Sequence, residues 1–115
     1  MFVNKVSVDC SEILDGDSFH DVFVRAFGFP AFYGRNLNAW IDCMTSLDAP
    51  DDGMSEVHCS PGTVLTLELQ HVREFKECRP DLYDALIECS AFVNFRRNEC
   101  GEPSVIALSY HLPSQ

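Results

Sequence analysis

The sequence lacks the patterns that mark membrane proteins, redox proteins and most families of enzymes. It contains no run of about 18 apolar residues, so no membrane-spanning helix is predicted. It has no CxxC spacing, which argues against zinc ribbons and thioredoxin-like sites. It has no GxSxG motif and no phosphate-binding glycine loop, and none of its four histidines pairs with a nucleophile at a recognisable spacing. No enzyme is therefore predicted, and neither a cofactor nor a metal is expected.

Basic residues are also scarce. The 115 residues include 8 Lys and Arg against 18 Asp and Glu, which gives a formal net charge of −10. Such a surface repels nucleic acids and anionic membranes and attracts basic partners over a long range. Acidity can equally serve solubility alone, so charge does not by itself decide the function.

Six cysteines invite a disulfide interpretation, which other features oppose. The chain is long enough for one core and 46% of its residues are hydrophobic, so residues 1–115 are predicted to form a single domain without disulfide staples. No basic and apolar leader precedes the first predicted strand, so we expect free thiols in a cytoplasmic protein. Thiol or metal chemistry stays an alternative, because His58 and Cys59 are adjacent and could contribute to a metal site. It is a minor one, since neighbouring side chains in a loop rarely both reach one ion.

The order of predicted elements indicates an α/β fold. Short apolar or alternating segments predict strands at residues 2–8, 63–69 and 104–109, and helical periodicity predicts helices near residues 17–27, 37–47, 70–77 and 80–99. Strands separated by helices predict a small parallel sheet with helices packed on it. The run 104–109 is almost continuously apolar, so we expect it to be the central strand. Residues 48–62 are predicted to form a long loop, which we expect to be an insertion or a functional segment.

The segment 29–47 has the most specific pattern in the chain. Gly34 permits a positive φ in the turn before the helix, and Asn36 suits the N-cap position. At about 100° per residue, the helix divides into an apolar stripe and a polar side, with Ile41 at the border. The stripe consists of Leu37, Trp40, Met44 and Leu47, and the polar side of Asn38, Asp42 and Thr45. An amphipathic helix with a solvated face explains this pattern without any function.

The order of residues in this segment is more specific than its polarity. An aromatic pair and a glycine precede Asn-Leu-x-Ala, and an Asp-Cys pair with an apolar residue and a threonine follows. The matching residues are Phe32, Tyr33, Gly34, Asn36, Leu37, Ala39, Asp42, Cys43, Met44 and Thr45. This pattern resembles the signature of the barstar family, small intracellular inhibitors of secreted ribonucleases. The resemblance implies a small three-stranded parallel sheet packed with about three to four helices, in agreement with the predicted elements.

The resemblance also implies a function. It implies that the chain inhibits a toxin ribonuclease by binding its active site through an acidic helix face, as a cytoplasmic immunity protein that is monomeric when free. Asp42 matches the family's principal acidic residue, whose carboxylate would stand in for a phosphate within a cluster of Arg, Lys and His. The other positions implied to face the ribonuclease are Phe32, Gly34, Asn36, Asn38, Ile41, Thr45, and Arg96 or Arg97.

Several residues depart from the family's pattern. Asn38 stands where the family has an aspartate, Ile41 replaces a tryptophan, and Arg35 replaces a glutamate. A family glutamate on the last helix falls on Arg96 or Arg97. Because like charges that face each other cost several kcal/mol, we expect the natural partner to be a toxin nuclease other than barnase, with an acidic group at its rim. The alternative is a protein-interaction module of this family whose partner is not a nuclease.

Overall fold

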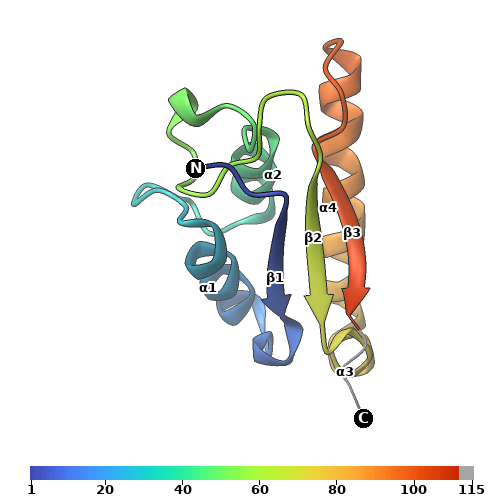
Figure 1. The fold of residues 1–115 in the computed structure, drawn as a ribbon. Coiled ribbons are helices and arrows are strands. Elements are labelled where there is room, and N and C mark those ends of the chain that lie inside the picture. The colour runs from blue at the N-terminus through green and yellow to red at the C-terminus, as the bar shows by residue number, and fades with distance from the viewer. Residues whose placement is uncertain (112–115) are drawn as a thin grey trace.

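A computed structural model describes residues 1–111 and contains one parallel sheet of three strands in the order β1-β2-β3 (Figure 1). The strands are β1 (Lys5–Asp9), β2 (Leu65–Gln70) and β3 (Ile106–His111). Both pairings are parallel, and Leu67 lies between Val6 on β1 and Leu108 on β3. The predicted α/β fold with a small three-stranded parallel sheet is confirmed.

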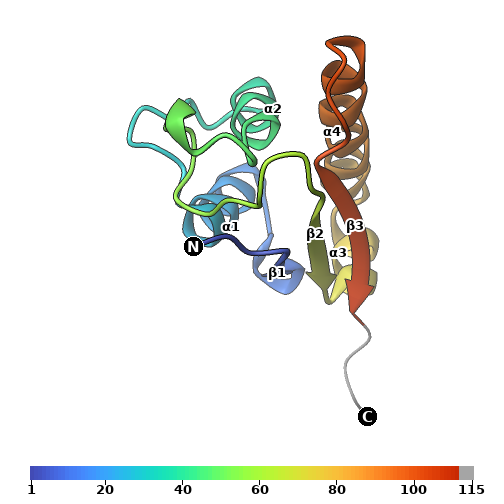
Figure 2. The same cartoon turned by 45° about the horizontal axis from the view of Figure 1, so that its top comes forward.

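Within residues 1–111, four helices connect and cover the strands. They are α1 (Gly16–Phe27), α2 (Leu37–Thr45), α3 (Val72–Cys78) and α4 (Pro80–Glu99), and two short 3-10 helices, η1 (Cys10–Glu12) and η2 (Pro50–Asp52), lie in the connections. The long helix α4 runs behind β2 and β3, and α1 lies beside β1 (Figure 1). Helix α2 lies towards the end where the strands begin, and α3 lies where they finish (Figures 1 and 2). None of the helices described between residues 1 and 111 has the length and apolar composition of a membrane span.

Local sequence signals set the helix ends. Asp15 caps α1, because its side chain accepts from the Ser18 N–H at 2.8 Å, and Ser18 Oγ accepts in return from the Asp15 N–H at 2.9 Å. Gly28 ends α1 with a φ of 68°, a conformation that glycine adopts without strain. Pro80 opens α4 in the first turn, where its missing N–H removes no helical hydrogen bond.

The core lies between one face of the sheet and the helices. Leu65, Leu67 and Leu69 of β2 are fully buried and alternate with half-buried residues, so one face of this strand meets the core. Helix α1 contributes aromatic rings, including that of Phe23, whose centroid lies 5.4 Å from that of Trp40 on α2 in an edge-on arrangement. This packing fixes α2 against α1 and so fixes the direction in which the polar side of α2 points.

The central strand is β2, so the prediction that residues 104–109 form the central strand is wrong. β3 lies at the edge of the sheet and pairs with β2. Ile106 is buried, whereas Ala107, Tyr110 and His111 are exposed. An apolar run can form an edge strand as well as a central one. The outward-facing residue here is Ala107, whose small side chain exposes little apolar surface to water.

The long link at residues 48–62 is an ordered loop that is tied to both neighbouring helices. The Cys59 N–H donates to the carbonyl of Leu47, just after α2, at 3.0 Å. The Glu56 N–H donates to the carbonyl of Phe27, the last residue of α1, at 2.9 Å. The loop therefore packs as part of the fold, and its status as an insertion stays a prediction.

Candidate partner-binding site

The loop before α2 is held by hydrogen bonds at its last residue. Asn36 is the N-cap of α2: its Oδ1 accepts from the Ala39 N–H at 2.8 Å, and its Nδ2 donates to the Gly34 carbonyl at 3.3 Å. The predicted cap is confirmed, and it satisfies a backbone N–H that the first helical turn leaves without an internal partner. Asn36 therefore uses its polar atoms to shape the site.

Arg35, and not Gly34, adopts the positive φ in this loop. The φ of Arg35 is 53°, and the glycines with positive φ lie elsewhere in the chain, so that prediction for Gly34 is wrong. Gly34 provides space instead, because a Cβ there would lie 3.2 Å from Asn36 Nδ2 and would crowd the cap. The Arg35 guanidinium donates to the Asp17 carbonyl at 3.0 Å and to Asp21 Oδ1 at 2.9 Å, which ties the loop to α1.

A second contact between the loop and α1 joins Tyr33 to His20. The Tyr33 hydroxyl lies 2.6 Å from His20 Nδ1. Burial raises the pKa of the Tyr33 phenol, while burial and the nearby Arg35 guanidinium lower the pKa of His20. The phenol therefore keeps its proton and donates to a neutral imidazole. Phe32 lies between Pro30 and Tyr33 in this loop, and its side chain stays at the surface, 73% exposed.

The polar side of α2 carries an ion pair with α4. Arg96 Nη2 donates to Asp42 Oδ1 at 3.1 Å and lies 3.4 Å from Thr45 Oγ1, which itself donates to the Ile41 carbonyl at 2.6 Å. Both charged side chains are accessible, with 56% of the Asp42 side chain and 42% of the Arg96 side chain exposed. Asn38 is exposed one turn before Asp42. The structure thus brings Asn38, Asp42, Thr45 and Arg96 together on one surface.

Ile41 and Leu37 differ in burial from what is expected of them. Ile41, expected to face a ribonuclease, is only 8% exposed and belongs to the hydrophobic core cluster. Leu37, expected in the core, is 36% exposed in the first turn of α2. Ile41 offers almost no surface to a partner, and its assignment to the interface is corrected.

Arg97 is corrected in the same way. Its guanidinium donates to both carboxylate oxygens of Asp48, at 3.0 and 2.9 Å, and to the Thr45 carbonyl at 2.8 Å, with 3% of its side chain exposed. Burial alone would raise the pKa of Asp48, yet the hydrogen bonds from Arg97 and from a backbone N–H hold this pKa below its ordinary value. The sequence contains a signal for the burial of Arg97, because Arg97 lies one helical turn after the buried Val93. Arg96 is the arginine that reaches the candidate site.

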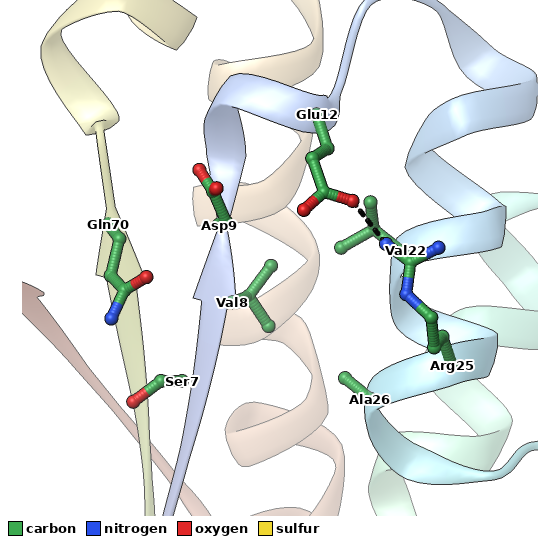
Figure 3. Close-up of a pocket in the computed structure, with 8 residues that line it drawn as sticks. All are labelled: Ser7, Val8, Asp9, Glu12, Val22, Arg25, Ala26 and Gln70. Carbon is green, nitrogen blue, oxygen red and sulfur yellow. Dashed lines mark hydrogen bonds and ion pairs between the residues drawn. The ribbon is translucent and has the colours of Figure 1, made fainter.

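A groove of about 240 Å³ lies apart from this surface, between β1, η1 and α1 (Figure 3). The Arg25 guanidinium on α1 is ion-paired with the Glu12 carboxylate on η1 at its edge (Figure 3). Asp9 accepts from the Ser11 hydroxyl at 2.6 Å, and this hydrogen bond lowers the pKa of its carboxyl group. The Asp9 carboxyl is therefore held as an anion and is not suited to donate a proton to a substrate, while the Glu12 carboxylate is already bound by Arg25.

The residues that thiol or metal chemistry would need are dispersed. Within the described part of the chain, no three His, Cys, Asp or Glu side chains are arranged to hold a metal ion. All six cysteines are free thiols in the structure: Cys10, Cys43 and Cys59 are buried, Cys89 is half-buried, and Cys78 and Cys100 are exposed. Cys43 fills a core position on α2 next to Asp42, as a small apolar side chain would.

The three-stranded parallel sheet with helices packed on it makes this a small α/β protein. The accessible carboxylate–guanidinium pair between α2 and α4 gives it a surface suited to protein binding. The family model described as Barstar (barnase inhibitor) matches residues 3–108. The chain therefore belongs to the barstar family, whose members bind and inhibit ribonucleases and are not enzymes. The resemblance seen in residues 29–47 is confirmed. No curated protein matches the chain.

Proposed function

We propose that this chain is an immunity protein that binds a cognate toxin ribonuclease in the cytoplasm and blocks its active site. The observation that carries the proposal is Asp42, an exposed carboxylate on the polar side of α2 in a member of the barstar family. A ribonuclease holds the phosphate of RNA with Arg, Lys and His side chains. The Asp42 carboxylate offers those side chains an anion in place of the phosphate, and the resulting charge-assisted hydrogen bonds exclude RNA.

The proposed contact set contains the accessible members of the candidate site, which are Phe32, Asn38, Asp42, Thr45 and Arg96. Gly34 and Asn36 support this surface indirectly, because they fix the loop and the first turn of α2. Ile41 and Arg97 are buried and leave the set. The surface therefore combines one carboxylate, one guanidinium and one exposed aromatic ring.

The Asp42–Arg96 pair determines which charges suit a partner. Arg96 occupies Oδ1 of Asp42, so a partner cation can approach Oδ2 without displacing Arg96. A partner that presents only basic groups would also place them against the Arg96 guanidinium, which costs several kcal/mol. The proposed ribonuclease therefore carries an Asp or Glu beside its phosphate-binding cluster, where the carboxylate forms a bidentate pair with Arg96. Members of the family bind barnase through an acidic face, so barnase should bind this chain only weakly.

Inhibition of RNA cleavage tests the proposal. The purified chain is titrated into barnase and into the ribonuclease encoded beside its own gene, since inhibitors of this family accompany their toxins. We expect Asp42→Ala to weaken binding to the inhibited enzyme by about 2 kcal/mol or more, a magnitude general to interface hot spots, with little change in melting temperature. Glu74→Ala removes an exposed acid from α3, at the opposite end of the sheet from α2 (Figure 1), and should leave binding unchanged. If neither enzyme is inhibited, or if Asp42→Ala loses stability but not affinity, the proposal is wrong.

Charge reversal at Arg96 tests the proposed specificity. Arg96→Glu combined with Asn38→Asp supplies the acids that the family pattern has at these positions, so affinity for barnase should rise and affinity for the cognate enzyme should fall. The same reversal at Arg97 should destabilise the fold instead, because that side chain is buried against Asp48. Unchanged affinities for both enzymes after reversal at Arg96 would place α4 outside the interface.

A further inference from the structure

Helix α4 exposes two large aromatic side chains next to each other. Phe92 is 46% exposed and Phe95 is 58% exposed, and their rings stack with centroids 6.3 Å apart. Glu88 lies one turn before Phe92, Glu99 lies one turn after Phe95, and both carboxylates are exposed. The spacing i, i+4, i+7 and i+11 aligns the four side chains along one side of the helix. These four residues are called the α4 stripe.

The α4 stripe borders the candidate site. At about 100° per residue, Arg96 lies between the stripe and the buried side of α4 that Val93 marks. Arg96 also follows Phe92 by one turn, and its guanidinium reaches Asp42 on α2 at 3.1 Å. The polar side of α2, Arg96 and the α4 stripe therefore form a continuous surface across two helices.

We propose that the α4 stripe is the apolar part of the interface with the cognate ribonuclease, and that it receives an apolar side chain flanked by basic residues. This inference rests on the proposed function, because it assigns the partner's chemistry at the same surface. Aromatic side chains and arginines are the residues that contribute most to interface affinity, and here an exposed aromatic pair adjoins Arg96. Glu88 and Glu99 at the two ends of the stripe supply the charge complement for the partner's basic residues.

The charges argue against a second copy of the chain as the occupant. A symmetric dimer would place the stripe against itself, so the carboxylates of Glu88 and Glu99 would approach their counterparts on the other copy. Each copy also carries a formal net charge of −10, and this repulsion opposes association. A basic ribonuclease meets neither obstacle.

The test measures binding of the ribonuclease encoded beside the gene, with barnase in parallel, to the natural chain and to three variants. Phe92→Ala/Phe95→Ala should weaken binding to the inhibited enzyme by about 30-fold and leave the melting temperature almost unchanged, because both side chains are exposed and alanine favours helix. Leu14→Ala is the matched control: it removes an apolar side chain that is 70% exposed before α1, and affinity should change less than about twofold. Asp42→Ala is measured alongside to test the proposed function itself.

The outcomes separate the two proposals. Weak binding by the double variant and full binding by Leu14→Ala support the α4 stripe as part of the interface. Full binding by the double variant beside weak binding by Asp42→Ala removes the stripe from the interface and leaves the proposed function intact. Full binding by both variants, or no ribonuclease bound by the natural chain, overturns both proposals. Equal losses in the control and the double variant, or a natural chain that sediments as a dimer through Phe92 and Phe95, would also overturn the inference.

Discussion

At the scale of single residues, two adjacent arginines show how position on a helix decides what a charge can do. The Arg96 side chain is 42% exposed and pairs with Asp42, whereas the Arg97 side chain is 3% exposed and pairs with Asp48. The step of about 100° between neighbours turns one towards solvent and the other into the core. An exposed ion pair adds little stability and exchanges partners readily. Removing one member of a buried pair leaves the other charge buried without a partner, which destabilises the fold.

The buried pair should make folding sensitive to the charge at Asp48. Asp48→Asn leaves the Arg97 guanidinium without its main counter-charge and should lower the free energy of unfolding at neutral pH by about 3 kcal/mol, measured by urea denaturation. Glu102→Gln is the control, since Glu102 lies 3.3 Å from the same guanidinium but 57% of its side chain is exposed. That change should cost less than about 1 kcal/mol. Equal effects of the two substitutions would mean that burial does not matter at this site.

The contribution of Asp48 should depend on pH in one direction. Its pKa in the folded chain is lowered from the ordinary value of 3.8, so its stabilisation is complete above that value and is lost as the pH falls through the folded pKa. The difference in unfolding free energy between the natural chain and Asp48→Asn should stay constant from neutral pH to about pH 5 and should close in more acidic buffer. A difference that already narrows near pH 6 would indicate a histidine as its source.

The six thiols should separate into two groups by reactivity. Burial raises the pKa of four of them: that of Cys10 to about 12, that of Cys43 to about 11, and also those of Cys59 and Cys89. Iodoacetamide at neutral pH should therefore label the exposed Cys78 and Cys100 quickly and the other four only after unfolding, as intact mass and peptide mapping will show. Cysteines that react only after reduction would reveal a disulfide and contradict the proposed cytoplasmic location.

At the scale of elements, two helices are followed by glycines with the same conformation in different surroundings. Gly28 after α1 has a φ of 68° and Gly101 after α4 has a φ of 80°. A Cβ on Gly28 would lie 2.8 Å from Glu56 Cβ, whereas a Cβ on Gly101 would meet nothing within 4 Å. Gly101→Ala should therefore cost about 1 kcal/mol of stability from the backbone alone, and Gly28→Ala about 3 kcal/mol, because the loop must also shift. Equal losses in urea denaturation would show that the loop yields freely.

Elements are predictable from this sequence where neighbouring residues decide them. The cap at Asn36 and the start of α4 at Pro80 follow from residues a few positions apart. The order of strands in the sheet does not, because β2 and β3 are both apolar and their places depend on contacts between distant parts of the chain. The left-handed backbone of Arg35 is also not predictable from neighbouring residues, because the adjacent Gly34 is the residue expected to adopt a positive φ. In the structure, this conformation of Arg35 accompanies its hydrogen bonds to α1.

The candidate site divides along the same line. Asn38 and Asp42 are exposed as helical periodicity predicts. Ile41 and Arg97, which the resemblance assigns to the interface, are both buried. Helical spacing from the buried Val93 signals the burial of Arg97, whereas Ile41 lies at the border between the two sides of α2 and its burial has no such local signal. Asp48 gives no signal of its own in the sequence, and it becomes the partner of Arg97 only once α2 and α4 are packed. Helical spacing thus predicts the accessible acid of the site and the buried arginine, and tertiary packing supplies the counter-charge of that arginine.

At the scale of the whole molecule, the long-range field and the contact surface differ in character. The chain carries a formal net charge of −10, so its long-range field attracts a basic partner. The candidate surface is mixed, because Arg96 partly neutralises Asp42 and the exposed ring of Phe32 adds apolar area. The field governs how often the partners meet, and the contact surface governs which of them stay bound.

This difference predicts separate salt dependences for association and dissociation. The association rate constant with the cognate ribonuclease should fall at least about tenfold between about 0.01 M and about 1 M salt, as the Debye length shrinks from about 30 Å to about 3 Å. Dissociation should change far less. Asp42→Ala should keep most of the salt dependence of association, since every other acid remains, and should dissociate faster because the central contact is lost. Stopped-flow association and competitive dissociation measure the two rates separately. If the salt dependence disappears together with Asp42, one carboxylate steers the partner, and the acidity of the remaining surface serves solubility alone.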